Sequence, residues 1–154
     1  KELLLFQQID PNMTDKAGET ALYHACYKGH ENVVKVLIQH PRIDPNTTTS
    51  SGSTPLMIAS YWGHAECVRI LLKNKDININ QQDNRGYTAL IWACAWGKTD
   101  VVRRLLEHDT IDTTIKSRLG GKTALGIASR KNQTDIVQML QEHIAKKNES
   151  HKKN

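Results

Sequence analysis

The residue types that could carry out catalysis are spread evenly along this 154-residue chain. Acids and histidines fall at matching places in successive segments, as His30 and His64 do after a glycine. Catalysis requires one asymmetric group of side chains that converge on a single point. No GxSxG, HExxH, phosphate-binding loop or dinucleotide-binding glycine pattern occurs in the sequence. We therefore predict that the protein is not an enzyme and uses no cofactor.

Three cysteines limit the metal and redox chemistry that is open to the chain. Cys26, Cys67 and Cys94 cannot all pair, and no CxxC or Cys/His group has the spacing of a zinc site. His40, His108 and His143 lie one or two repeats apart and do not form a cluster. The sequence thus predicts reduced thiols, no metal site, and a cytoplasmic or nuclear location.

The formal charge of +5 invites a nucleic-acid partner, but its distribution argues against one. Residues 145–154 hold four Lys and one Glu, a net +3, so the remaining body carries only +2. This is a weak electrostatic case for a phosphate-binding groove. No run of 18 apolar residues occurs, so we predict no membrane insertion.

A string of about 34 residues recurs along the chain. Thr20, Thr54, Thr88 and Thr123 mark its register, with steps of 34, 34 and 35 residues. The copies are GETALYHACYKGH (18–30), GSTPLMIASYWGH (52–64), GYTALIWACAWGK (86–98) and GKTALGIASRKNQ (121–133). A second apolar string follows each copy, at 32–40, 66–74, 100–108 and 135–143, and LLLF at 3–6 matches the end of one such string. Periodicity of this length indicates a stacked-repeat protein.

Each unit reads as two short helices. Thr54 is a natural N-cap and Pro55 suits the first helical position. Leu56, Ala59 and Ser60 follow at i, i+3 and i+4 and predict one narrow buried face. The first helices are expected to end at left-handed caps, which are Gly29, Gly63, Gly97 and, in the last unit, Asn132.

The units resemble ankyrin repeats in DKAGETAL (15–22), DNRGYTAL (83–90) and STPL (53–56). The resemblance implies an all-α solenoid of stacked helix-turn-helix units with β-hairpin loops. It departs from the family where Tyr23, Met57, Ile91 and Gly126 replace the usual His, and where Thr49 replaces an Asp and predicts a looser hairpin. The expected boundaries are 1–14 for the second half of a preceding repeat, 15–48, 49–82 and 83–117 for repeats one to three, 118–147 for a C-terminal repeat, and 148–154 for a basic, disordered tail.

The aromatic residues SYWGH (60–64) point to a binding surface. At about 100° per residue from Leu56, Trp62 and Ile58 face outward and Tyr61 lies on a flank. Equivalent positions then form two outward columns, Lys28, Trp62, Trp96 and Lys131 beside His24, Ile58, Trp92 and Ile127. Trp, Tyr and Arg dominate interface energy, at about 2 kcal/mol or more for each hot spot.

The resemblance implies that tips and first helices line a concave face that binds a protein partner. We predict a non-catalytic interaction module that favours acidic partners and is part of a longer chain. The partner-binding residues are predicted to be Tyr27, Lys28, Tyr61, Trp62, Arg85, Tyr87, Trp92, Trp96, Arg130 and Lys131. Three alternatives stay open: aromatic packing between repeats, nucleotide or RNA binding by Trp stacking with Lys and Arg contacts, and a structural spacer in a longer repeat array. Hydroxylation, known for some family members, would fall on Asn80.

Overall fold

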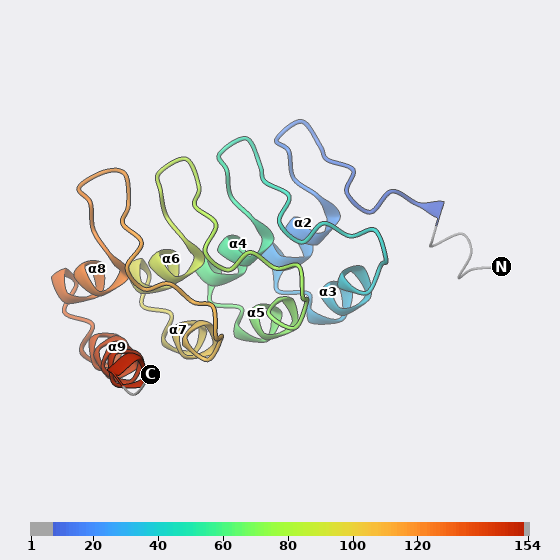
Figure 1. Cartoon of the computed structure of the whole chain (residues 1–154). Helices are drawn as coiled ribbons and strands as arrows, with labels where there is room; N and C mark the ends of the chain where they lie inside the picture. Colours follow the sequence, from blue (N-terminus) through green and yellow to red (C-terminus); the bar gives the residue numbers. More distant parts are fainter. Residues whose placement is uncertain (1–7, 153–154) are drawn as a thin grey trace.

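A computed structural model gives the fold of the chain and describes residues 8–152 (Figure 1). Of the predicted half-repeat at 1–14, residues 1–7, with the LLLF string, lie outside the described residues. The described part contains four pairs of helices that follow one another along the chain. The pairs are α2 (Ala21–Lys28) with α3 (Glu31–Ile38), α4 (Pro55–Trp62) with α5 (Ala65–Leu71), α6 (Ala89–Ala95) with α7 (Thr99–Leu106), and α8 (Ala124–Arg130) with α9 (Thr134–Lys152).

The helices stack in two rows, as Figure 1 shows. The first row is α2, α4, α6 and α8, and the second row is α3, α5, α7 and α9; each helix packs against its neighbours in the row and against its pair mate. The loop before each first helix extends away from the second row. The predicted all-α solenoid of stacked helix-turn-helix units is therefore confirmed.

The predicted helix caps are present in the structure. Oγ1 of Thr20, Thr54, Thr88 and Thr123 accepts a hydrogen bond from the backbone N–H three residues later, at 3.1–3.2 Å. A left-handed residue follows each first helix, at Gly29, Gly63, Gly97 and Asn132. Every first helix therefore begins at the same place in its unit, and this fixes the register of the side chains that it exposes. The ends differ by one residue: α2 and α4 run up to their glycine caps, whereas α6 and α8 end at Ala95 and Arg130, two residues before Gly97 and Asn132.

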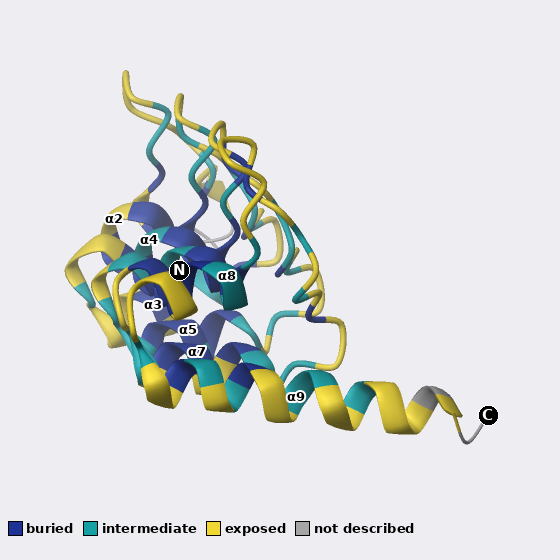
Figure 2. Cartoon of the chain, turned by 90° about the vertical axis from the view of Figure 1, so that its left-hand side faces the viewer, coloured by how far each residue is buried: buried dark blue, intermediate teal, exposed yellow. Residues whose placement is uncertain are grey.

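The core lies between the two rows and is continuous along the stack (Figure 2). Leu22 and Cys26 of α2 are fully buried, as are Ala59 and Ser60 of α4. The Ser60 hydroxyl donates to the backbone carbonyl of Leu56 at 2.7 Å, so this buried polar group is satisfied. The small side chains of this face allow neighbouring helices to approach closely.

Asparagine side chains join the loops that lead from one unit to the next. Asn12 Nδ2 donates to the Arg42 carbonyl at 2.8 Å, while its Oδ1 accepts from the Asp44 N–H at 2.8 Å. Asn46 and Asn80 repeat this bridge one and two units further along. A single amide thus satisfies both a donor and an acceptor of the next loop.

The loops before the first helices, which we call the tip loops, are residues 15–20, 49–54, 83–88 and 117–123. The predicted β-hairpins are not confirmed as strand pairs: within residues 8–152 the structure has one antiparallel bridge, between Thr14 and Thr20, and no strand. Each tip loop is instead closed by a backbone hydrogen bond across its base, such as Asp83 N–H to the Tyr87 carbonyl at 3.0 Å. Neighbouring loops also bond to each other, through Ser50 N–H to the Ala17 carbonyl at 2.9 Å and its equivalents.

The tip loop of repeat two lacks the usual aspartate but stays closed. Thr49 Oγ1 accepts from the Ser53 N–H at 3.2 Å, whereas the equivalent Asp15 and Asp83 each accept from two backbone N–H groups through Oδ1. The threonine therefore replaces one of the two side-chain bonds.

The C-terminal segment differs from the sequence prediction. A disordered tail was predicted from residue 148, whereas α9 is 19 residues long and remains helical to Lys152. Ala, Lys and Glu in this segment are good helix formers. Lys147 Nζ also donates to the Ile111 carbonyl at 2.5 Å, which holds the helix against the preceding loop. Figure 2 shows the rest of α9 projecting beyond the stack. Among the described residues, no helix has the length and apolar character that a membrane crossing requires.

The three thiols should resist modification in the folded protein. Cys26, Cys67 and Cys94 are free and fully buried. Burial raises the pKa of the Cys26 thiol well above its usual range, and raises the pKa of Cys67 to about 11 and of Cys94 to about 12. A raised thiol pKa leaves less of the reactive thiolate at pH 8.

We expect iodoacetamide at pH 8 to label the native chain at least roughly 100-fold more slowly than the chain unfolded in guanidinium, where a thiol pKa is near 8.5. Intact-mass spectrometry would count the labels over time. Rapid labelling of any one cysteine in the native chain would contradict its burial.

Candidate functional site

Six aromatic rings form a continuous network over α2, α4 and α6. Tyr61 lies at its centre and makes edge-to-face contacts with Trp62, Trp92 and Trp96, with ring centroids 5.1, 5.4 and 4.9 Å apart. Trp62 extends the network to Tyr27 at 5.5 Å, and Trp92 extends it to Tyr87 at 4.9 Å. We call these six residues the aromatic network. Edge-to-face pairs at such distances contribute about 0.5–1.5 kcal/mol each beyond the area they bury.

Part of the aromatic network faces solvent. Tyr27, Trp62 and Trp96 keep 38%, 45% and 51% of their surface exposed, respectively. The helical register explains the direction of the Trp62 and Trp96 indoles, and the prediction that they face outward is confirmed. Exposed aromatic groups of this size are costly to leave in water and commonly mark an interaction site.

Trp92 is positioned differently from its prediction. It was expected to face outward, but it is half-buried, and its indole Nε1–H donates to Asp83 Oδ2 at 2.9 Å. The other carboxylate oxygen of Asp83 accepts from the backbone N–H groups of Arg85 and Tyr87 at 2.9 and 2.8 Å. The tip loop therefore folds back over this position of the first helix. Trp92 supports the tip loop and contributes only part of its ring to the surface.

The same correction applies to the rest of that column. Ile127 was expected to face outward but is 4% exposed and belongs to the hydrophobic core. Ile58 is half-buried and packs against the same core. For Ile58 and Trp92 the physical reason is that the tip loops lie against this side of the first helices, whereas Trp62 and Trp96 face solvent. His24, in the first unit, is exposed.

Cationic side chains flank the aromatic network. Lys28 Nζ lies 4.9 Å from the Tyr27 ring centroid, and Lys131 Nζ lies 5.5 Å from that of Trp96. Arg85 lies 5.9 Å from the Trp92 ring. Lys131 Nζ also donates to the Ala95 carbonyl at 2.6 Å. Arg130 is exposed at the end of α8. The structure thus brings nine of the ten predicted residues into direct contacts with one another, and places Arg130 beside Lys131.

A pocket of about 270 Å³ opens between the tip loops and first helices of repeats two and three. Met57, Ile58 and the rings of Tyr61 and Trp92 supply its apolar walls, and Arg85 lies at its edge. Its other lining residues are Tyr23, Ser51, Ser53, Asp83 and Asn84. An apolar pocket with a few polar groups is the usual form of a site for one side chain or small group.

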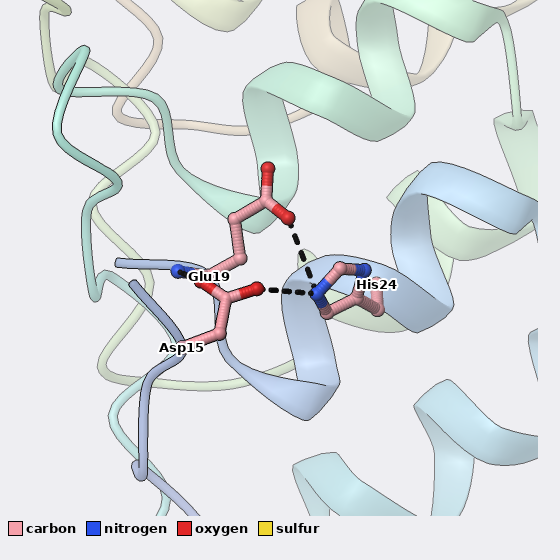
Figure 3. A group of neighbouring side chains, drawn as sticks. All are labelled: Asp15, Glu19 and His24. Atoms are coloured by element: carbon pink, nitrogen blue, oxygen red, sulfur yellow. Dashed lines mark hydrogen bonds and ion pairs between the residues drawn. The ribbon is translucent and has the colours of Figure 1, made fainter. Parts of the chain in front are cut away.

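One charged group was missed by the sequence analysis. His24 Nε2 lies 3.2 Å from both Asp15 Oδ2 and Glu19 Oε2, and Figure 3 shows the three side chains converging from the first tip loop and α2. A hydrogen bond from the Glu19 backbone N–H, with further bonds from His24 and Ala17, holds the pKa of Asp15 below its usual value. The spacing of nine residues from Asp15 to His24 also separates Asp83 from Trp92, and this recurrence is the signal that could have found the group.

Paired helices stacked in two rows, with capped first helices and exposed aromatic rings on one face, define a solenoid of helical repeats. Residues 1–83 and 75–151 both match the family model described as ankyrin repeats in three copies, so the chain belongs to the ankyrin repeat family. Ankyrin repeats generally serve as protein–protein interaction modules, and the family is typically non-catalytic.

Four curated proteins match this chain over a short stretch. Osteoclast-stimulating factor 1 from Rattus norvegicus and from Mus musculus are each 49% identical over 37 residues, which is 24% of this chain and 17% of theirs. The protein of that name from Monopterus albus is 50% identical over 34 residues, 22% of this chain and 16% of its own. The chain therefore aligns with less than a fifth of the length of these relatives, which is about one repeat.

Proposed function

We propose that this protein is a non-catalytic module that binds another protein or peptide on its tip face. We define the tip face as the four tip loops together with the outward sides of α2, α4, α6 and α8. The observation that carries the proposal is the aromatic network, in which Tyr27, Trp62 and Trp96 remain exposed although their rings are already ordered.

The order of these rings favours binding. Each exposed ring contacts a neighbouring ring edge to face, so little rotamer freedom remains to be lost when a partner covers it. The cations Lys28, Arg85 and Lys131 lie against the rings and favour acidic partners. The free thiols support a reducing compartment, the cytoplasm or the nucleus, as the place of binding. We also propose that the module is part of a longer chain.

The test removes the exposed rings without touching the core. We expect Trp62→Ala with Trp96→Ala to leave the chain folded, at a cost of about 1 kcal/mol for each ring from the lost edge-to-face contacts, and to weaken partner binding at least about tenfold, since hot spots of this type contribute about 2 kcal/mol or more. Partners captured by the wild-type chain would be purified and their affinity measured by calorimetry.

The matched control is Val33→Ala with Val36→Ala on α3, which removes apolar side chains that are 47% and 54% exposed on another element. Equal losses of affinity in both double variants, or none in the Trp variant, would contradict the proposal. A steep fall of affinity with salt would instead favour phosphate recognition.

A further inference from the structure

The net charge of the tip face rises from zero in repeat one to +4 in repeat four, and its accessible carboxylates, Asp15 and Glu19, are confined to repeat one. The tip loop and first helix of repeat one (15–29) carry Asp15, Lys16, Glu19 and Lys28, with His24 beside the two acids. The equivalent segment of repeat two (49–63) has no charged residue. That of repeat four (117–132) carries four cations and no acid, namely Arg118, Lys122, Arg130 and Lys131.

One column of equivalent positions shows the change most directly. The residue before each capping threonine is Glu19, Ser53, Tyr87 and Lys122 in turn. Glu19 and Asp15 direct carboxylate oxygens at a single imidazole nitrogen, which gives two acids for one donor. At the other end, Arg118, Lys122 and Arg130 are exposed and form no ion pair within residues 8–152.

The middle of the face is apolar. Five of the six rings of the aromatic network and the pocket of about 270 Å³ lie over repeats two and three, between the carboxylates of repeat one and the cations of repeat four. The only carboxylate in the tip loop and first helix of these two repeats is Asp83, which is 5% exposed and already accepts three hydrogen bonds. This part of the face therefore offers apolar contact and little negative charge.

We propose, on the basis of the function proposed above, that the tip face binds an extended peptide segment with ordered charges. Its cationic end lies at Asp15 and Glu19, its apolar centre enters the pocket between repeats two and three, and its acidic end lies over Arg118, Lys122 and Arg130. Three steps of roughly 8–10 Å between stacked helices span about 24–30 Å. At about 3.3 Å per residue, an extended segment of about seven to nine residues covers that length.

The test uses synthetic peptides of about nine residues with the same apolar centre, Leu-Phe-Leu. One has two lysines at one end and two glutamates at the other; three controls carry glutamates at both ends, lysines at both ends, or serines at both ends. With the wild-type chain, we expect the bipolar peptide to bind at least about tenfold more tightly than the serine peptide and at least about threefold more tightly than either uniform peptide, as exposed ion pairs contribute about 0.2–1 kcal/mol each.

Charge reversals at the same column give the decisive comparison. We expect Glu19→Lys and Lys122→Glu each to weaken the bipolar peptide at least about threefold, although its net charge is zero and a general field would leave it unaffected. Lys35→Glu on α3 is the matched control, and it should leave the affinity unchanged. A nitroxide on the glutamate end should broaden amide signals near Lys122 and Arg130 more than those near Glu19.

The outcomes separate this inference from the function on which it rests. If all peptides bind equally and all lose affinity in the Trp62→Ala/Trp96→Ala variant, the ordered-charge inference is wrong and the aromatic binding surface stands. If the Trp62→Ala/Trp96→Ala variant binds every peptide as tightly as the wild-type chain does, both the ordered-charge inference and the proposed aromatic binding surface are wrong. If Lys35→Glu weakens the bipolar peptide as much as Lys122→Glu, the charges do not act locally and the inference is overturned.

Discussion

Replacing Trp92 by alanine is expected to lower the free energy of unfolding by about 3–5 kcal/mol, the usual cost of deleting a packed Trp side chain. The loss has two parts. The ring packs against Tyr61 and Tyr87, and its N–H satisfies Oδ2 of the buried Asp83. Removing that donor leaves a buried carboxylate oxygen without its partner, which is itself costly.

Trp96→Ala is the matched control, since this indole lies one turn further along the same helical stretch and is 51% exposed. We expect it to cost about 1 kcal/mol, from lost ring contacts with Tyr61. Trp92→Phe keeps most of the packing and isolates the hydrogen bond, with an expected cost of about 1–3 kcal/mol. Urea unfolding followed by far-ultraviolet circular dichroism measures all three. Equal losses for Trp92→Ala and Trp96→Ala would show that the tip loop does not depend on Trp92.

Gly86→Ala is expected to destabilise the chain by about 2–4 kcal/mol. Gly86 has φ +77°, where a side chain costs about 1–2 kcal/mol. An added Cβ would also lie 2.6 Å from the backbone nitrogen of Arg118, which donates to the Arg85 carbonyl at 2.9 Å. The methyl group would therefore break the bond that joins the tip loops of repeats three and four.

Gly121→Ala separates the two causes. Gly121 has φ +56° but an added Cβ would meet nothing within 4 Å, so we expect only the conformational cost of about 1 kcal/mol. Thermal unfolding of both variants, analysed with denaturant curves, gives the difference. If Gly121→Ala were as damaging as Gly86→Ala, backbone strain alone would explain both, and contact between the tip loops would contribute nothing.

The repeat register made most of the fold predictable from the sequence. Thr54, Gly63 and the small residues of the first helices each have one physical role, and that role recurs in every unit. The outward direction of Trp62 and Trp96 followed from helix geometry alone, because the neighbouring side chains cover only part of each ring and leave 45% and 51% of these residues exposed.

Where a second element covers a position, the sequence prediction was incomplete. A helical wheel centred on Leu56 cannot show that the tip loops fold over Ile58 and Trp92. The contact from Asp83 to Trp92 joins the irregular tip loop to α6 across nine residues, and the equivalent contact from Asp15 to His24 was missed because a helical wheel does not include the tip loop. At the C-terminus, polar composition suggested disorder after residue 148, whereas local helix propensity and the contact of Lys147 with the Ile111 carbonyl continue α9.

The hydrogen bonds between neighbouring tip loops fix the spacing of the contact positions along the tip face. Ser50, Asn84 and Arg118 each donate a backbone N–H to the preceding tip loop, so the tip loops, one per repeat, cannot shift independently of one another. A ligand must therefore match the pitch of the stack, because the stack has little freedom to match the ligand. Exchanging the order of whole 34-residue units would then change which side chains a ligand meets at each position along the tip face, while the distance between positions stayed constant.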